Sequence, residues 1–204
     1  MPGATCYVWQ GLNDAIEPAD YVTSSSDLVG ALAAGDRTAI RRVYKEYHEQ
    51  VRAFARRLLG VDADAEEVVQ EVFLALPRGV KGFQGKSTLG TFIMGMAVNH
   101  ARHALRASAR RRSALKRFAE EVPVTAAHGA PDEFLVRQQL ADRLLSAMDQ
   151  LNEEQRVTFV LCEVEERSSS EVAEILGIPS STVRARVSAA REKLRVALGT
   201  EAEP

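Results

Sequence analysis

The sequence predicts an all-α protein made of two small helical domains joined by a flexible linker. Apolar residues make up 46% of the 204 residues but aromatic residues only 6%, which favours an aliphatic, helical core. Apolar residues also recur at spacings of three and four in several segments, as amphipathic helices require. This period fails over 113–133, where Pro123, Gly129 and Pro131 mark a linker that divides the helices into two groups.

The first group begins after residues 1–26, which show no sustained period and are interpreted as an N-terminal extension. A long amphipathic helix is expected from Asp36 to near Gly60. A second helix follows, with Asp62 or Asp64 as its N-cap, and Pro77 is expected to end it.

A third helix is expected to begin at Thr91, after a polar, glycine-rich stretch over 78–90. It runs into a segment with seven bases and no acid between Ala101 and Ala119. The second helix has the opposite charge, with five acids and no base between Asp62 and Glu71. Three such helices with a shared apolar seam form a bundle of about 85 residues, which is enough to bury a core.

The second group opens with a helix and a capping-box signature. Asn152 and Gln155 have the spacing at which each side chain bonds the other residue's backbone N–H at a helix start. The helix before them carries Leu140, Leu144, Ala147, Met148 and Leu151, and the helix that they open carries Val157, Val160, Leu161 and Val164.

Residues 168–195 carry the pattern of a helix-turn-helix. Ser168 and Glu171 form a second capping box, and Gly177 supplies the left-handed end of a short helix. Pro179 prevents continuation, and Ser180 is expected to cap the final helix. One face of that helix is apolar, with Val183, Val187, Ala190 and Leu194, and the opposite arc is polar and basic, with Ser181, Arg184, Ser188, Arg191 and Arg195 flanked by Arg186 and Lys193. This face fits the major groove of DNA, the alternative being an ordinary solvated helix.

Several other classes of protein are disfavoured. No apolar run approaches the ~20 residues of a membrane span, and the first ten residues lack the features of a signal peptide, so a cytoplasmic protein without membrane insertion is expected. Cys6 and Cys162 form neither a disulfide framework nor a zinc pattern. The four histidines have no spaced carboxylates or cysteines beside them. We therefore expect no enzyme, no catalytic residue, no metal site and no cofactor.

Three segments resemble one known family when taken in their order and separation: DADAEEVVQEVF (62–73), STLGTFIMGMAVNHARHALR (87–106) and SSSEVAEILGIPSSTVRARVSAAREKL (168–194). They are similar to extracytoplasmic-function (ECF) sigma factors of bacterial RNA polymerase. The resemblance implies sigma region 2 at 27–112, a linker at 113–133 and sigma region 4 at 134–199. It further implies a subunit that binds core polymerase, recognises the −10 and −35 promoter elements and starts transcription of a stress- or signal-responsive regulon.

The same resemblance assigns site residues and partners. The surface for the clamp helices of the largest polymerase subunit would comprise Asp64, Glu67, Gln70, Glu71 and Phe73. The −10 contacts would come from Lys86, Ser87, Thr88, Asn99, Arg102, His103 and Arg106, and the −35 contacts from Ser181, Thr182, Arg184, Arg186, Ser188 and Arg191. Two alternatives stay open, namely a solvated charge run for Arg110 to Arg112 and a surface histidine for His103. The implied partners are the clamp helices and flap region of core polymerase, promoter DNA and an anti-sigma factor.

The chain departs from the family at a few positions. Phe92 and Pro77 stand where the family often has Trp, and Ala185 and Ala189 replace longer side chains on the groove-facing helix. These changes leave the class intact but place fewer long donors toward DNA. Two other functions stay open, a helix-turn-helix transcriptional regulator that acts without polymerase core and an enzyme built on a helical bundle.

Overall fold

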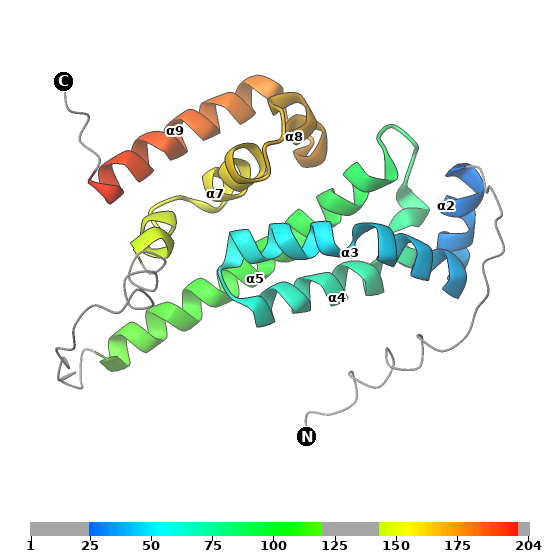
Figure 1. Cartoon of the computed structure of the whole chain (residues 1–204), viewed down its shortest axis with the longest axis horizontal. Helices are drawn as coiled ribbons and strands as arrows, with labels where there is room; N and C mark the ends of the chain where they lie inside the picture. The colour runs from blue at the N-terminus through cyan, green and yellow to red at the C-terminus, as the bar shows by residue number, and fades with distance from the viewer. Residues whose placement is uncertain (1–24, 120–142, 200–204) are drawn as a thin grey trace.

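The computed structural model describes residues 25–119 and 143–199, and every regular element in these two stretches is a helix (Figure 1). The all-α prediction is confirmed. The N-terminal module contains α2 (Ser25–Ala34), α3 (Arg37–Leu59), α4 (Asp62–Gly79), the 3-10 turn η1 (Val80–Gly82) and α5 (Leu89–Ala119). The C-terminal module contains helical residues 143–148, α7 (Glu153–Phe159), the π-helical turn η2 (Val160–Val164), α8 (Ser169–Leu176) and α9 (Ser180–Leu198).

Two interpretations of the sequence fall partly outside the described residues. Most of the N-terminal extension, residues 1–24, is not described, whereas residues 25 and 26 already belong to α2. Most of the predicted linker and the start of the helix through Leu140 are likewise outside the description. Helix α5 continues to Ala119, so residues 113–119 of the predicted linker are helical.

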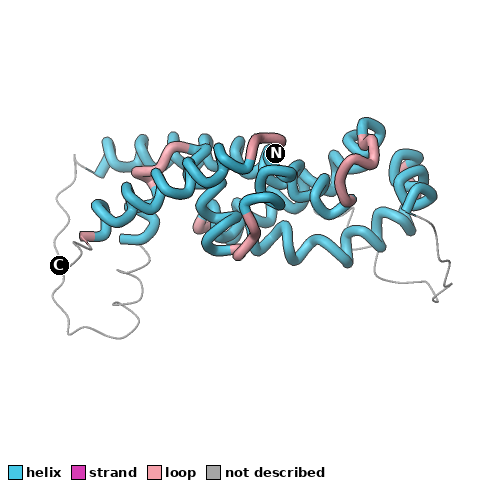
Figure 2. The backbone as a smooth tube through the Cα atoms, turned by 90° about the horizontal axis from the view of Figure 1, so that it is seen from above, coloured by secondary structure: helices cyan, strands magenta, loops and turns pink. Residues whose placement is uncertain are grey.

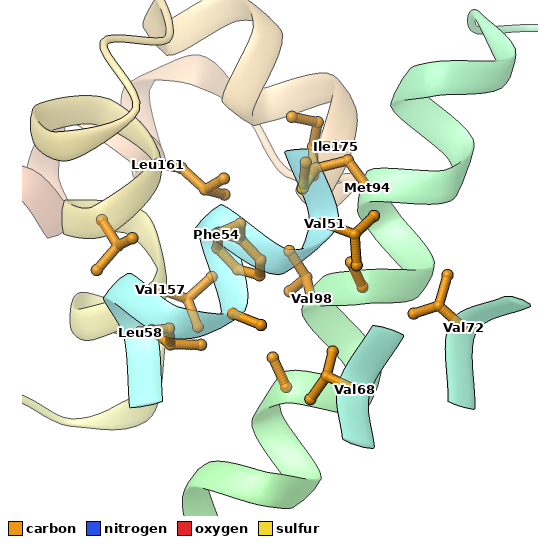
Figure 3. Packing of buried hydrophobic residues seen from close by; sticks show 14 of the residues in the cluster. Val51, Phe54, Leu58, Val68, Val72, Met94, Val98, Val157, Leu161 and Ile175 are labelled. Atoms are coloured by element: carbon orange, nitrogen blue, oxygen red, sulfur yellow. The ribbon is translucent and has the colours of Figure 1, made fainter. Parts of the chain in front are cut away.

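The N-terminal module is a bundle in which α3, α4 and α5 run side by side and α2 packs across one end (Figure 1). Its core is aliphatic with Phe54 and Phe73 as the large aromatic residues, as the composition predicted. Each long helix contributes an apolar stripe, and Figure 3 shows Val51, Phe54 and Leu58 from α3, Val68 and Val72 from α4, and Met94 and Val98 from α5 meeting in the interior.

The ends of α3 follow their local signals. The Asp36 carboxylate accepts a hydrogen bond from the Ala39 N–H at 2.8 Å, so Asp36 caps the first turn. At the other end Gly60 takes a left-handed conformation with φ of 76°, and its N–H bonds the Arg56 carbonyl at 2.8 Å. A Cβ on Gly60 would also lie 2.5 Å from a methyl carbon of Leu145, so glycine serves both the turn and a close approach.

The predicted ends of α4 and the predicted start of α5 are wrong by one to three residues. Val61, rather than an aspartate, is the N-cap of α4, and Pro77 lies inside the helix. Proline removes only the N–H that would bond Phe73, and burial of Val80 at 1% exposure holds the chain in helical turns beyond it. Helix α5 begins at Leu89 because the Thr88 hydroxyl accepts a hydrogen bond from the Thr91 N–H at 3.1 Å.

Both capping boxes of the C-terminal module are confirmed. The Gln155 N–H donates to the Asn152 side chain at 2.8 Å, and the Ser168 N–H donates to the Glu171 carboxylate at 2.8 Å. The bonds from Ser168 lower the pKa of the Glu171 carboxyl. Gly177 takes the predicted left-handed conformation, with φ of 63°.

Two expectations in the C-terminal module are wrong. Ser180 does not cap α9, because Pro179 is the N-cap and its carbonyl already accepts the Thr182 N–H at 2.9 Å. Val164 does not share the apolar face of Val157, Val160 and Leu161, because Val164 is 42% exposed. The π-helical turn, marked by the bond from the Glu165 N–H to the Val160 carbonyl, changes the helical phase and turns Val164 outward.

The two modules pack against each other through a continuous apolar core. Val157, Leu161 and Ile175 of the C-terminal module meet the side chains of α3 and α5 shown in Figure 3. Figure 2 shows the same helices from above, with short loops joining neighbouring helices in each module. The backbones also approach closely, since a Cβ on Gly95 would lie 3.3 Å from the Ile175 carbonyl oxygen. The described chain is therefore in a closed arrangement, which the sequence did not predict.

Candidate functional site

The predicted −10 residues on α5 lie on one helix face, and the C-terminal module covers part of that face. Asn99, Arg102 and Arg106 are spaced by three and four residues, so their side chains share one side of the helix. Arg102 pairs with Glu154 at 2.9 Å, and Arg106 pairs with Glu153 at 3.3 Å. Asn99 remains exposed. In the closed arrangement, Arg102 and Arg106 are therefore paired with α7, whereas the Asn99 amide is exposed to solvent.

His103 and the loop residues have more local roles. The His103 ring lies 3.3 Å from the Arg106 guanidinium and is exposed. In the loop, Thr88 caps α5, and the Ser87 hydroxyl donates to the Thr88 carbonyl at 3.4 Å. Lys86 is exposed beside Gly85, whose φ is 69°. The loop is thus held at its helical end, and the Lys86 side chain is exposed to solvent.

A cleft of about 330 Å³ lies between α5 and α8. Ser87, Asn99 and Arg102 line one side of this cleft, and Glu174 and Ile175 line the other. Three of the seven predicted −10 residues therefore line a concave surface that the second module completes in the closed arrangement.

The predicted −35 residues lie on α9, whose inner face is buried as expected. Val183, Val187, Ala190 and Leu194 are at most 7% exposed. On the opposite side Ser181, Arg184 and Ser188 are exposed, and Thr182 is half-buried. Arg191 forms a bidentate pair with Glu163, from Nη2 to Oε1 at 2.8 Å and from Nε to Oε2 at 3.3 Å. Arg186 is half-buried and pairs with Glu154 at 2.5 Å. Of the three predicted arginines, Arg184 alone has no ion pair among the described residues.

The predicted polymerase surface on α4 is mostly exposed. Glu67, Gln70 and Glu71 face solvent, and Glu71 lies 3.9 Å from the His100 ring. Burial lowers the pKa of His100, and the Glu71 charge opposes that shift. Asp64 is half-buried and pairs with Arg111 at 2.6 Å, which ties the acidic and basic segments together.

Phe73 does not lie on the exposed face of α4. The prediction that its side chain belongs to the polymerase-binding surface is wrong. It is 2% exposed and packs edge-on against Tyr44, with ring centroids 4.9 Å apart. Its place in the helix follows from the spacing that it shares with Val69, Val72 and Leu76, all of which point inward. Phe73 is therefore a core residue that packs beneath the exposed acidic face of α4.

Sequence reasoning missed Arg156, which joins the two modules. Arg156 as a whole is 2% exposed. Its guanidinium donates to the Leu58 carbonyl at 2.7 and 3.0 Å and to Asp149 at 2.7 Å. Leu58 lies in the last turn of α3, where carbonyls lack intrahelical partners. A signal was present, because Arg156 stands four residues before Val160, on the apolar stripe of its helix. Such a buried cation requires acceptors.

The described residues offer no other chemistry of note. No group of three or more histidine, cysteine or acidic side chains among them is arranged to hold a metal ion. None of the described helices is both long and apolar enough to cross a bilayer.

Comparison with known proteins shows to which family the chain belongs. A profile described as Sigma-70 region 2 matches residues 43–111, and one described as Sigma-70, region 4, matches residues 141–194. The chain is 30% identical over 187 residues to the ECF RNA polymerase sigma factor SigE of Mycolicibacterium smegmatis, covering 90% of this chain and 70% of that one. The chain belongs to the ECF sigma factors. It is also 29% identical over 173 residues to the ECF RNA polymerase sigma-E factor of Escherichia coli (strain K12), covering 82% and 90% of the two chains.

Solved structures share the fold of this ECF sigma factor. CnrH in complex with the cytosolic domain of CnrY matches with a TM-score of 0.60 and 19% identity, over 86% of this chain and 97% of that one. RpoE in complex with the anti-sigma factor NepR from Bartonella quintana matches with a TM-score of 0.50 and 22% identity, over 79% and 97%. The presence of both sigma regions in one chain does not favour a helix-turn-helix regulator that lacks polymerase contacts. Sigma factors are initiation factors rather than enzymes.

Proposed function

We propose that this ECF sigma factor docks core polymerase on the outer face of α4, binds the −10 element through α5 and its preceding loop, and reads the −35 element with α9. The observation that carries the proposal is the occurrence of both sigma regions in order, each with an exposed polar face opposite a buried apolar one. The protein would act in the cytoplasm, where polymerase and promoter DNA are found.

The α4 face suits a polymerase contact because its exposed groups are acidic. Acidic side chains at a solvent-exposed rim steer association with a basic partner and change its rate more than its affinity. Reversal of Glu67 and Glu71 to lysine is expected to slow binding to core polymerase and to weaken its salt dependence. Reversal of Glu46 and Glu49 on α3 changes the charge equally and serves as the control. Equal effects of the two pairs would contradict a docking role for α4.

The α5 face suits single-stranded DNA because an exposed amide lies among arginines beside a cleft. Unstacking a base costs a few kcal/mol, and phosphate contacts close to a receptive cleft can offset that cost. Asn99→Ala is expected to reduce open-complex formation, measured by permanganate reactivity of the melted bases, while −35 binding stays intact. Equal loss of both activities would contradict this assignment.

The α9 face suits the major groove because Arg184 is exposed at its centre. A bidentate arginine contact to guanine discriminates against other bases by ~1 to 3 kcal/mol. Arg184→Ala should therefore relax the preference at one −35 position, with Arg143→Ala as the control, since Arg143 is exposed on the same module but lies outside the helix-turn-helix. An arginine that touches only phosphate would instead weaken all promoters alike and flatten the salt dependence.

The proposal is tested as a whole by run-off transcription with bacterial core polymerase. Core enzyme with this chain is expected to start at defined sites on promoters that core alone does not use, and sequencing the starts gives the −10 and −35 elements. Binding to a palindrome as a dimer, without stimulation of core polymerase, would favour a regulator instead. Because RpoE was solved with an anti-sigma factor, we also propose such an inhibitory partner for this chain.

A further inference from the structure

The loop assigned to the −10 element is anchored at both of its ends. This loop, residues 84–88, leads from η1 into α5 at the end of the bundle where α2 packs (Figure 1). Before it, the Phe83 N–H donates to the Val80 carbonyl at 3.0 Å and closes η1. After it, the Phe92 N–H donates to the Thr88 carbonyl at 3.0 Å. The backbone is therefore hydrogen-bonded on either side of the loop.

Two aromatic rings connect these ends directly. Phe83 precedes the loop and Phe92 follows it, and their ring centroids lie 5.2 Å apart with an edge-on angle of 61° between the planes. The ring quadrupoles favour this geometry. The Phe92 ring also extends over the end of α4, where a Cβ on Gly79 would lie 4.0 Å from it. The ring pair therefore sets the span that residues 84–88 must bridge.

A third ring, that of Tyr47 on α3, supports the first turn of α5. A Cβ on Gly90 would lie only 2.9 Å from Tyr47 Cε1 and 3.5 Å from Cζ, whereas carbon atoms in contact prefer about 3.5 to 4.0 Å. Gly90 is helical, so the ring contact rather than the backbone conformation requires glycine. Burial, with a hydrogen bond to the Glu46 carboxylate, raises the pKa of Tyr47 to about 12, so the ring is uncharged at neutral pH.

The braced segment carries part of the cleft assigned to the −10 element. Ser87 and Phe92 line this cleft together with Asn99 and Arg102. A shift of the ring pair would move the loop relative to Asn99 and Arg102, which lie further along α5. A selective binding site needs its groups held to within about 0.5 Å, so the rings are placed where they control the shape of the cleft.

We propose that Tyr47, Phe83 and Phe92 form a loop brace, a set of positioning residues that hold residues 84–88 in the shape that selects the bases of the −10 element. The inference rests on the proposed function, because it takes the loop to contact the −10 strand. The brace lowers the cost of ordering the loop on binding, and it excludes loop conformations that would accept other bases. Base preference at −10 then depends on aromatic packing behind the loop.

Ordinary core packing by the same rings would have a different effect. A ring that only stabilises the fold changes the fraction of folded protein, so its loss lowers transcription from all promoters alike. A ring that positions the loop changes which −10 bases are preferred, while binding to core polymerase and to the −35 element stays intact. The two roles are therefore separated by the ranking of bases rather than by the amount of transcript.

The order of the loop can be measured in the free, full-length chain without a promoter. Tyr47→Ala is expected to speed hydrogen exchange of the Thr91 and Phe92 amides, followed by NMR, roughly 3- to 10-fold, as loss of an aromatic contact allows. Tyr47→Phe keeps the ring and should exchange like the wild-type chain. Tyr44→Ala is the matched control, because it truncates a ring of the same helix that packs on Phe73 instead of on α5.

Gly90→Ala tests the same contact without deleting a side chain. Alanine suits a helical position better than glycine does, so harm can come only from the ring that lies 2.9 Å away. The single substitution should speed exchange of the Phe92 amide, whereas its addition to Tyr47→Ala should cause no further increase. Additive effects of the two substitutions, or no effect of Gly90→Ala, would show that the contact does not hold the loop.

Base preference is measured by run-off transcription with bacterial core polymerase. The template library has a randomised −10 element, and the rest of the promoter is taken from the start sites of the wild-type chain. Phe83→Leu, Phe92→Leu and Tyr47→Ala should each lower the ratio of the preferred to the next base roughly 3- to 10-fold. Phe92→Tyr retains the ring and should restore the wild-type ranking.

Faster exchange together with lower −10 selectivity, in Tyr47→Ala but not in Tyr47→Phe or Tyr44→Ala, supports the proposal. Equal effects of the two alanine substitutions, unchanged exchange, or a uniform loss of transcripts with an unchanged ranking of bases overturns it. The two levels are separated by the wild-type chain. Its failure to start transcription refutes the proposed function and with it the −10 role of the loop brace, whereas normal transcription with no change of preference in the variants refutes only the loop brace.

Discussion

Replacement of Arg156 by alanine is expected to open the protein without unfolding its N-terminal module. The guanidinium caps the C-terminal turn of α3 through the Leu58 carbonyl and also bonds Asp149, although it belongs to the other module. Alanine removes these donors from an interior position that is 2% exposed. The side-chain stem also fills space between the modules, so packing is lost together with charge.

The magnitude follows from the buried carbonyl that the substitution leaves behind. A hydrogen bond to a charged group contributes about 1.5 to 3 kcal/mol, and an unsatisfied buried acceptor costs about 1 to 3 kcal/mol. These two terms overlap, so the free energy that favours the closed over the open arrangement should fall by about 3 kcal/mol. This corresponds to roughly a hundredfold increase in the ratio of open to closed protein. The loss has a ceiling, because separation of the modules exposes the Leu58 carbonyl to water and removes the penalty.

Small-angle X-ray scattering and thermal unfolding together measure this effect. Arg156→Ala should increase the radius of gyration and lower the melting temperature of the C-terminal module, and Arg156→Lys should be intermediate because lysine cannot bridge the same acceptors as a planar fork. Arg195→Ala is the matched control, since that arginine is 50% exposed and pairs within its own helix. A wild-type radius and melting temperature for Arg156→Ala would refute the reasoning.

Three further predictions concern the elements that set up the sites. Gly60→Ala should destabilise the protein by about 1 to 2 kcal/mol, because alanine is strained at φ of 76° and its Cβ would displace Leu145; unchanged stability in urea unfolding would contradict this. Ser168→Ala should cost ~0.5 to 2 kcal/mol through loss of the capping box, with Ser170→Ala on the exposed face as the control, and equal costs would argue against a capping role. His100 should titrate below its usual pKa of 6.5 by NMR, and Glu71→Gln should lower the pKa further; a raised pKa would show that the carboxylate outweighs burial. Since the unfolded state then binds the proton more readily, the contribution of neutral His100 to stability is present above pH 6.5 and is lost as the pH falls toward the lowered pKa.

Local signals in the sequence were enough to locate most helices and several of their ends. Asp36, Gly177 and the two capping boxes could be predicted because each depends on residues three or four positions apart. Ser180 was misassigned as a cap, since its neighbour Pro179 adopts the extended conformation that a cap requires. Pro77 was misread as a stop, since the burial of Val80 that carries the helix past it is a tertiary effect.

The arrangement of the candidate sites could be predicted only in part. The exposed arc of α9 follows from helical periodicity, as does the exposed acidic face of α4. By contrast, the pairing of Glu153 and Glu154 with distant arginines could not be predicted. Acids in a first helical turn are already explained by the helix dipole. Their contacts depend on how the modules pack, and that packing joins residues about 50 or more positions apart, at Arg102 with Glu153 and at Arg57 with Glu165.

The most direct test of the closed arrangement is the distance between the modules before and after assembly on a promoter. Fluorescence resonance energy transfer can report it between labels at Gln50→Cys on α3 and Val196→Cys on α9, both at exposed positions, with Cys6 and Cys162 replaced by serine. High transfer is predicted in the free protein, followed by a fall once the chain is assembled with core polymerase on promoter DNA. Low transfer in the free protein, or no change on promoter DNA, would contradict the account.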